Sequence, residues 1–211
     1  EDFWLMGEVI HGDYSRWTNP EMLYSVTNYE LHKSLYSGLN DHNFFEIAHN
    51  VRRLEAIGTK LYTFVDNHDE NRIASKLKKE SHLPLAYLLL FTLPGIPSIY
   101  YGGEWGIKGM RTNYSDVELR PQLAIADSSD LHCALTDFIT KLIHIHVNEP
   151  EFAGGRYQEL LLTNRQYAFA RHGKGTVVIT AANSDDSPSS LMIPVPISAS
   201  SAENLMDGSI I

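Results

Sequence analysis

The chain has 211 residues, 43% of them hydrophobic, which is enough for a hydrophobic core and for one or two domains. Its 26 acidic and 17 basic residues give a formal net charge of −9, which argues against nucleic acids and anionic membranes as partners. The one cysteine, Cys133, excludes an intramolecular disulfide and leaves the cellular compartment undecided, with a cytoplasmic location favoured over a secreted one.

The first third of the chain alternates between short apolar runs and a helical pattern. Residues 3–8 and 23–27 are typical of strands, and the apolar positions of residues 42–56 recur at the spacing of a helix. A third strand follows at 61–66, and a helix begins at 73–79. Alternation of this kind predicts parallel strands joined by crossover helices.

Residues 81–103 contain no Asp, Glu, Lys or Arg, and they are long enough to cross a membrane. A cluster of proline and glycine at 94–97 argues against a membrane span, because proline breaks a helix. The sequence instead predicts a helix at 83–93 and a short strand at 98–101. The chain would then have four barrel strands of an expected eight.

The last hundred residues change from a helical to a strand pattern. After a loop at about 102–128, an amphipathic helix has Leu131, Leu135, Phe138, Ile139, Leu142 and Ile143 on one face. It closes at residues 148–150. Alternating runs follow at 160–163, 167–171 and 176–181, with a glycine-marked hairpin between the last two and a turn or loop at 184–190.

Two of the predicted strands lead directly into acidic residues. Glu8 follows the first strand, and Asp69 follows the third within Asn67-His68-Asp69. In a barrel of alternating strands and helices, catalytic groups lie at the carboxyl ends of the strands. Taken alone, Glu8 could be an ordinary exposed glutamate, and the second motif could be a turn or a helix N-cap.

Three segments in family order resemble the alpha-amylase family of glycoside hydrolases (family 13). The segment at 7–9, Gly-Glu-Val, resembles the family's general-acid strand. The segment at 64–72, Phe-x-x-Asn-His-Asp-x-x-Arg, resembles the strand that carries the transition-state-stabilising aspartate. The segment at 95–106, Gly-Ile-Pro-x-x-Tyr-Tyr-Gly-x-Glu-x-Gly, resembles the eighth strand and the turn after it.

The resemblance implies roles for five residues. Glu8 would be the general acid of a retaining α-glycosidase, and Asp69 the carboxylate that stabilises the transition state. His68 would contact the same sugar. His11 could line this pocket or be a hydrogen-bonded loop histidine, and Arg72 could pair with a carboxylate of the site or cap the following helix.

Aromatic residues offer further candidates. Tyr100 and Tyr101, with Glu104, would support the eighth strand. Trp17 and Trp105 could stack on sugar rings or occupy positions in the core or at its rim.

The family's nucleophilic aspartate belongs to a Gly-x-Arg-x-Asp motif on the fourth strand, and this sequence does not contain that motif. The chain also begins at Glu1, without a methionine. We therefore expect the C-terminal portion of a larger α/β enzyme. Its fold would be the C-terminal half of a (β/α)8 TIM barrel over 1–150, followed by an antiparallel all-β, sandwich-like domain over 151–211. Alone it should be nearly inactive.

The expected partners are an α-glucan or maltooligosaccharide substrate and the missing N-terminal half of the barrel. Amylase, neopullulanase-like, maltogenic and α-1,6-glucosidase activities are all compatible, with hydrolysis or transglycosylation. An alternative is a non-catalytic carbohydrate-binding or scaffold module of the same fold, and a third possibility is a structural fragment. Open strand edges predict self-association or marginal stability. No cofactor or metal site is predicted, because His144 and His146 would face different sides of a helix and no phosphate-loop motif occurs.

Overall fold

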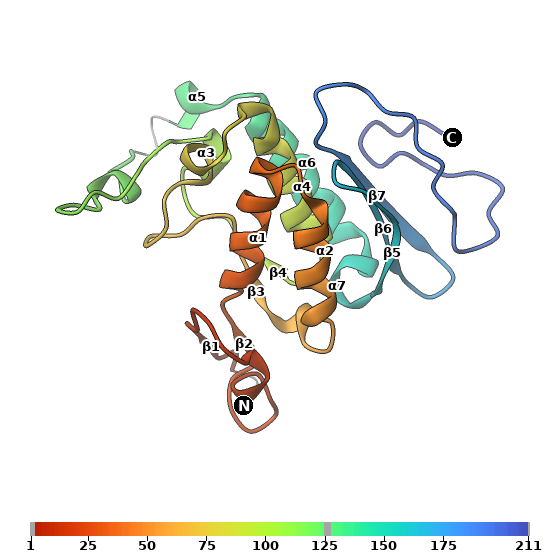
Figure 1. Ribbon diagram of the computed structural model, residues 1–211, viewed down its shortest axis with the longest axis horizontal. Helices are drawn as coiled ribbons and strands as arrows, with labels where there is room; N and C mark the ends of the chain where they lie inside the picture. The colour runs from red at the N-terminus through yellow and green to blue at the C-terminus, as the bar shows by residue number, and fades with distance from the viewer. Residues whose placement is uncertain (1–2, 125–127, 211) are drawn as a thin grey trace.

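The computed structural model describes residues 3–124 and 128–210 and places the helices between two separate groups of strands (Figure 1). Four short strands lie near the N-terminal half: β1 (Met6–Gly7), β2 (Ser25–Val26), β3 (Tyr62–Thr63) and β4 (Ile96–Pro97). The pairs β1–β2 and β3–β4 are parallel, and an isolated parallel bridge from Thr27 to the first residue of β3 connects the two pairs. Parallel strands in sequential order are the arrangement that the half-barrel prediction requires.

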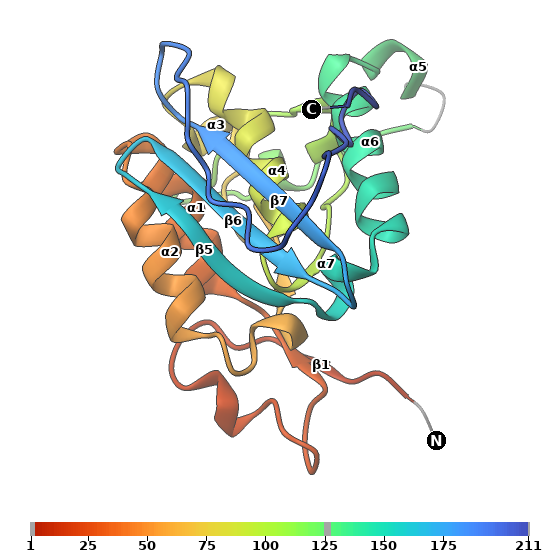
Figure 2. The same cartoon turned by 90° about the vertical axis from the view of Figure 1, so that its right-hand side faces the viewer.

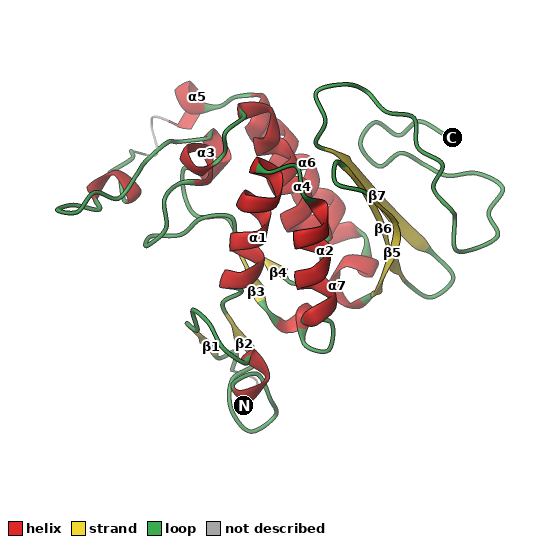
Figure 3. Cartoon of the chain, in the orientation of Figure 1, coloured by secondary structure: helices red, strands yellow, loops and turns green. Residues whose placement is uncertain are grey.

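Seven α-helices lie in the described residues, and most of them separate these strands from the C-terminal sheet (Figure 3). They are α1 (Tyr29–Asn40), α2 (Phe44–Arg53), α3 (Ile73–Lys76), α4 (Leu83–Thr92), α5 (Ser128–Leu131), α6 (Ala134–Asn148) and α7 (Pro150–Gly154). Short 3-10 turns are η1 (Tyr14–Arg16), η2 (Gly58–Lys60), η3 (Glu80–His82), η4 (Gly103–Trp105) and η5 (Val117–Leu119). No helix in the described part of the chain is long and apolar enough to cross a membrane.

Helix α1 is an element that the sequence-based prediction missed, since it placed only one helix, at 42–56, between the second and third strands. The Asn28 side chain accepts a hydrogen bond from the backbone N–H of Leu31 at 3.0 Å and so caps the helix. Leu31, Leu35 and Leu39 recur at intervals of four and are all buried. This periodic face packs against α2, which begins at Phe44 and ends at Arg53, within the predicted range.

The predicted strand at 98–101 is wrong, because the fourth strand lies two residues earlier. Gly95 has a φ of +151°, and a Cβ on it would lie 2.4 Å from Thr63 Cγ2, so only glycine lets the chain approach β3 this closely. Pairing therefore begins at Ile96. It ends after the Ser98 backbone N–H bonds Thr63 O at 2.9 Å, because the chain then turns, with the Gly103 N–H donating to Tyr100 O at 3.0 Å.

The C-terminal part is an antiparallel sheet of strands β5 (Arg156–Leu162), β6 (Gln166–His172) and β7 (Val177–Asn183), which lie side by side in that order (Figure 2). These strands confirm the three alternating runs of the sequence, and the turn at Gly175 (φ +86°) confirms the hairpin between β6 and β7. The segment after β7 runs along the side of the sheet that faces away from the helices (Figure 1).

One hydrophobic core joins the helices to this sheet. Buried side chains of α1, α2, α4 and α6 form a cluster that also includes Tyr157, Tyr167, Phe169 and Ala182 of the sheet. The fold is thus the C-terminal half of a TIM barrel followed by an antiparallel β-region. The domain boundary at 150 stays a prediction.

Candidate functional site

The two predicted catalytic carboxylates follow the first and third parallel strands, as the sequence predicts. Glu8 comes directly after β1 and is exposed. Asp69 lies on the loop after β3, with a side chain that is 38% exposed. Parallel strands present their carboxyl ends at the same edge of a barrel, so both residues belong to that edge.

A hydrogen-bonded chain connects the segments that carry the two carboxylates. The Tyr29 hydroxyl donates to Glu8 Oε1 at 2.8 Å and accepts from Asn67 Nδ2 at 3.0 Å. Asn67 Oδ1 in turn accepts the backbone N–H groups of Asp69 at 2.9 Å and Glu70 at 2.8 Å. The structure therefore brings Glu8 and the Asp69 loop into one network.

The Asp69 carboxylate lies among three basic side chains. His68 Nε2 is 3.2 Å from Asp69 Oδ2, while Arg111 and Arg120 donate to Asp69 Oδ1 at 3.3 and 2.9 Å. Arg120 also donates to the His68 carbonyl at 3.1 Å and pairs with Asp116 at 3.1 Å. Because these groups are partly exposed, the arrangement orients the carboxylate more than it adds to stability.

Arg72 lies in the interior and does not join this network directly. Its side chain is fully buried, and its guanidinium lies 4.3 Å from the ring centroid of Tyr100 and 5.3 Å from that of Tyr101. Its Nη1 donates to the Tyr101 carbonyl at 2.8 Å. Arg72 and the two tyrosines thus pack together just after β4, and the supporting role expected of Tyr100, Tyr101 and Glu104 stays a prediction.

Asp66 is the buried carboxyl group beneath the site. Its Oδ2 accepts the backbone N–H of Ile73 at 2.9 Å, and burial raises its pKa to about 6. Its Oδ1 has no hydrogen-bond partner within the described residues, and the same holds for the hydroxyl of Tyr87 and for Glu104 Oε2. Two nitrogens of the buried Arg72, Nε and Nη2, also have no hydrogen-bond partner within the described residues, and the charge of Arg72 acts against the effect of burial on Asp66.

A triad of Lys76, His32 and Glu70 lies at the Asp69 loop. Lys76 Nζ lies 2.8 Å from His32 Nε2 and donates to Glu70 Oε2 at 2.5 Å, and His32 Nε2 lies 3.5 Å from the same oxygen of Glu70. Hydrogen bonds from this pair lower the pKa of Glu70 to about 2, whereas burial lowers the pKa of His32. The triad holds the residue after Asp69 in place with an ionised carboxylate.

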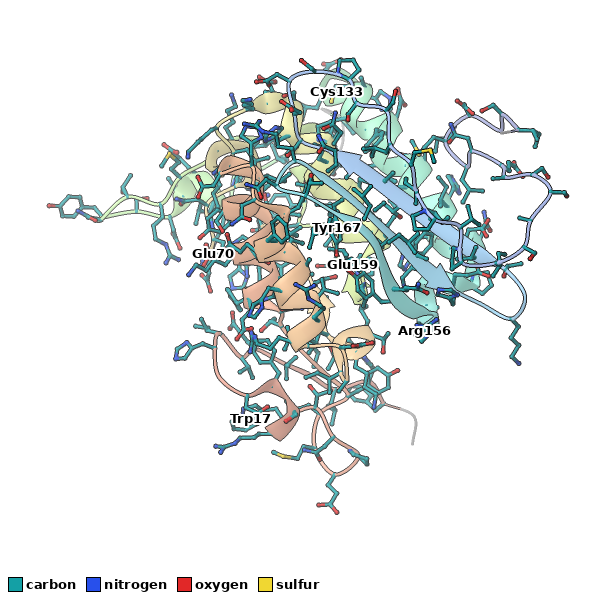
Figure 4. The ribbon with its side chains drawn as sticks, turned by 45° about the vertical axis from the view of Figure 1, so that its right-hand side comes forward. Trp17, Glu70, Cys133, Arg156, Glu159 and Tyr167 are labelled. Atoms are coloured by element: carbon teal, nitrogen blue, oxygen red, sulfur yellow. The ribbon has the colours of Figure 1, made fainter. Side chains whose placement is uncertain are left out.

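The remaining candidates are dispersed. His11 is exposed on the loop after Glu8. Trp17, 44% exposed, lies at the turn η1 and apart from Glu70 of the Asp69 loop (Figure 4). Trp105 lines a cavity of about 230 Å³ together with Leu77, Leu83, Lys108, Cys133, Leu135 and others, and no predicted site residue lines it.

Sequence reasoning missed Tyr29 and both arginines on Asp69. The available signal for Tyr29 was its place directly after the helix-capping Asn28. No local pattern predicts that Arg111 and Arg120 contact Asp69, because both lie on a loop more than forty residues downstream. In the described ranges, no cluster of three or more His, Cys, Asp or Glu side chains could hold a metal ion.

A match to a protein-family model identifies the family to which this site belongs. The family model of the alpha-amylase catalytic domain matches residues 1–141, which is two thirds of the chain and includes Glu8, Asp69 and the loop with both arginines. The chain belongs to the alpha-amylase family. The motif resemblance found in the sequence is thereby confirmed.

Two curated relatives are a cyclomaltodextrinase and a cyclomaltodextrin glucanotransferase. The chain is 27% identical over 187 residues to a cyclomaltodextrinase of Thermoanaerobacter pseudethanolicus, covering 85% of this chain and 32% of that protein. It is 30% identical over 125 residues to a cyclomaltodextrin glucanotransferase of a Bacillus species, covering 59% of this chain and 17% of that protein.

Solved structures of the family share the fold. The Anoxybacillus alpha-amylase superposes with a TM-score of 0.84 at 22% identity, over 100% of this chain and 48% of that one. The cyclic alpha-maltosyl-(1→6)-maltose hydrolase of Arthrobacter globiformis gives 0.74 at 19% identity, over 86% and 42%. The chain therefore spans between a sixth and a half of these relatives.

Proposed function

We propose that this chain forms part of a retaining α-glycosidase that cleaves α-glucosidic bonds in starch-like oligo- or polysaccharides. The observation that carries the proposal is the network in which Tyr29 and Asn67 join Glu8 to the Asp69 loop, inside a matched alpha-amylase catalytic domain. Glu8 is the general acid and Asp69 the stabilising carboxylate.

The chemistry follows from the two environments. Glu8 is exposed at the strand end, where it can reach the oxygen of a glycosidic bond and give it a proton. Asp69 is held by His68, Arg111 and Arg120, which keep a carboxylate facing the site, where it can hydrogen-bond sugar hydroxyls and favour the positive charge that develops on the ring.

A retaining mechanism also requires a nucleophile about 5 to 5.5 Å from the acid. Since the 211 residues contain no Gly-x-Arg-x-Asp motif, the nucleophilic aspartate of the proposed enzyme would come from outside this sequence. His68 and His11 are the proposed sugar contacts. For Arg72 we propose an indirect contribution through the stacked Tyr100 and Tyr101.

Sugar binding by this chain provides the first test. Calorimetric titration with maltooligosaccharides should detect binding in the millimolar range or tighter, and Asp69→Asn should weaken it because the amide loses the charge that accepts two sugar hydroxyls. Glu21→Gln, a change on the exposed loop after η1, should leave binding unchanged. No binding by the unaltered chain would contradict the proposal.

Turnover provides the second test. We expect no measurable starch hydrolysis by the 211 residues alone, because one member of the catalytic unit is lacking. In a chain extended to include the family's nucleophile, Glu8→Gln should lower kcat by about 100-fold or more, as loss of a general acid does. Near-normal turnover of that variant would exclude Glu8 as the acid. Binding without turnover in the extended chain would favour the non-catalytic module.

A further inference from the structure

Tyr29 is the side chain that touches both catalytic segments. It is the first residue of α1 and only 8% exposed, and its ring packs edge-on against Phe64 with 4.9 Å between ring centroids. The preceding Asn28 anchors the backbone, since its N–H bonds the Tyr62 carbonyl at 2.8 Å. Packing thus fixes the ring and leaves the hydroxyl at the edge where Glu8 lies.

The direction of each hydrogen bond in this network is determined. Backbone N–H groups can only donate, so the two that point at Asn67 Oδ1, from Asp69 and Glu70, fix the orientation of the Asn67 amide. Asn67 Nδ2 is then the donor toward the Tyr29 oxygen at 3.0 Å. The single hydroxyl hydrogen of Tyr29 is left for Glu8 Oε1, at 2.8 Å.

This polarity decides which oxygen of Glu8 can carry a proton. A protonated carboxyl group has one O–H and one carbonyl oxygen. The carbonyl oxygen is the stronger acceptor of the two, so the hydrogen bond from Tyr29 to Oε1 favours the proton on Oε2. When Oε2–H breaks and its proton forms the new O–H bond of the leaving sugar, the carboxylate that remains keeps the Tyr29 hydrogen bond, which is now charge-assisted and stronger.

We infer that Tyr29 is a positioning residue that selects Oε2 of Glu8 as the proton-donating oxygen and, through Asn67, couples the acid to the loop of Asp69. The inference rests on the roles proposed above for Glu8 and Asp69. The phenol hydroxyl carries the effect, since the packing of the ring against Phe64 would be preserved in Tyr29→Phe.

The titration of Tyr29 reports on this network without any sugar. Burial is the main cause that raises the pKa of Tyr29 to about 12. The hydrogen bond to Glu8 and the charges of Glu8 and Glu70 act in the same direction, while the hydrogen bond from Asn67 acts in the opposite direction. Removing Glu8 or Asn67 should therefore move the titration in opposite directions, which a merely loosened structure would not do.

The experiment uses the 211-residue chain with ¹³C at the ζ-carbon of tyrosine. The Tyr29 signal is the one that disappears in Tyr29→Phe. We expect its midpoint to fall in Glu8→Gln, to fall further in Glu8→Ala, to rise in Asn67→Ala, and to stay constant in the matched control Glu21→Gln. Should the chain unfold below pH 12, the same signal at pH 7 should still shift in the Glu8 and Asn67 variants and stay constant in the control.

The inference would be overturned if Glu8→Ala left the position and the titration midpoint of the Tyr29 signal unchanged while the circular dichroism spectrum also stayed unchanged. So would midpoints that move in the same direction in Glu8→Ala and Asn67→Ala. This outcome is separable from failure of the proposed function. The spectroscopic shifts need no substrate, whereas a chain that shows them but binds no maltooligosaccharide would retain the Tyr29 network and lose the glycosidase assignment.

Discussion

Individual residues beneath the site are more deeply buried than the catalytic candidates above them. Asp66, Arg72 and Tyr87 are each 1% exposed or less, while Glu8 is exposed and Asp69 is partly exposed. The two catalytic candidates are therefore accessible to solvent, whereas the groups beneath them are not. Burial of these polar groups lowers the free energy of unfolding, by an amount that depends on pH.

Asp66 makes that pH dependence testable. Its folded-state pKa of about 6 lies above the usual value of 3.8, so the folded state binds the proton more tightly than the unfolded state does. Stability from this group is therefore greatest below about pH 4 and is lost as pH rises toward 6, with a total of about 3 kcal/mol at most. In Asp66→Asn this loss should disappear.

Urea unfolding of both proteins at pH 4.5 and pH 7.5 measures the effect. The free energy of unfolding of Asp66→Asn, relative to the unaltered chain, should be higher at pH 7.5 than at pH 4.5. The exposed Asp130→Asn provides the control and should show no such difference. Equal relative stabilities of Asp66→Asn at the two pH values would contradict the assignment of a buried, proton-binding carboxyl group.

At the scale of secondary-structure elements, a buried cation on β6 joins the sheet to the helices. Arg171 has a fully buried side chain, and it donates to the carbonyls of Gly155 at 3.2 Å, Thr92 at 3.2 Å and Phe152 at 3.0 Å. Thr92 is the last residue of α4, so its carbonyl has no partner in the helix and suits a cation. Burial lowers the pKa of Arg171 to about 10, which still leaves it charged at neutral pH.

Arg171→Met should destabilise the chain by about 2 to 4 kcal/mol, because the buried carbonyls of Thr92 and Phe152 and the half-buried carbonyl of Gly155 lose their donor. The matched control is Arg165→Met. Arg165 is 43% exposed and pairs with Asp185 at 3.3 Å, so its loss should change the free energy of unfolding by about 0.5 kcal/mol or less. Urea unfolding followed by circular dichroism measures both. Similar losses for the two variants would show that Arg171 does not hold the sheet to the helices.

The elements themselves could largely be predicted from the sequence, because strand alternation and helix periodicity are local properties. The helices at α4 and α6 and the three strands of the C-terminal sheet follow from runs of neighbouring residues. Helix α1 was equally visible in the spacing of Leu31, Leu35 and Leu39. The fourth strand was misplaced because its position depends on the contact of Gly95 with Thr63, which no local pattern contains.

The candidate site was only partly predictable for the same reason. Glu8 and Asp69 each follow a recognisable strand. Their connection depends on Tyr29, which belongs to a helix between the two strands in sequence and meets both only in the folded chain. The two arginines on Asp69 come from a loop far downstream, so their contact is a property of the tertiary structure.

At the scale of the whole molecule, the N-terminal segment combines exposed apolar side chains with a free strand edge. In the described part of the chain, β1 pairs only with β2 and β4 pairs only with β3. The other edge of β1 and the other edge of β4 are therefore free. The N-terminal segment around β1 exposes Phe3, Trp4, Leu5, Met6, Ile10, Trp17, Met22 and Tyr24. Exposed apolar surface next to a free strand edge favours association with another chain.

We therefore predict that the 211-residue chain self-associates in solution through this N-terminal segment. In sedimentation velocity, the average sedimentation coefficient should rise with protein concentration, and Phe3→Asp combined with Ile10→Asp should reduce that rise. Met192→Asp combined with Val195→Asp is the matched control, since these side chains are 93% and 55% exposed in the segment after β7, against 78% and 59% for Phe3 and Ile10. A chain that stays monomeric and stable at every concentration would contradict the prediction, because the free strand edges and the apolar surface would then be compatible with an isolated half-barrel.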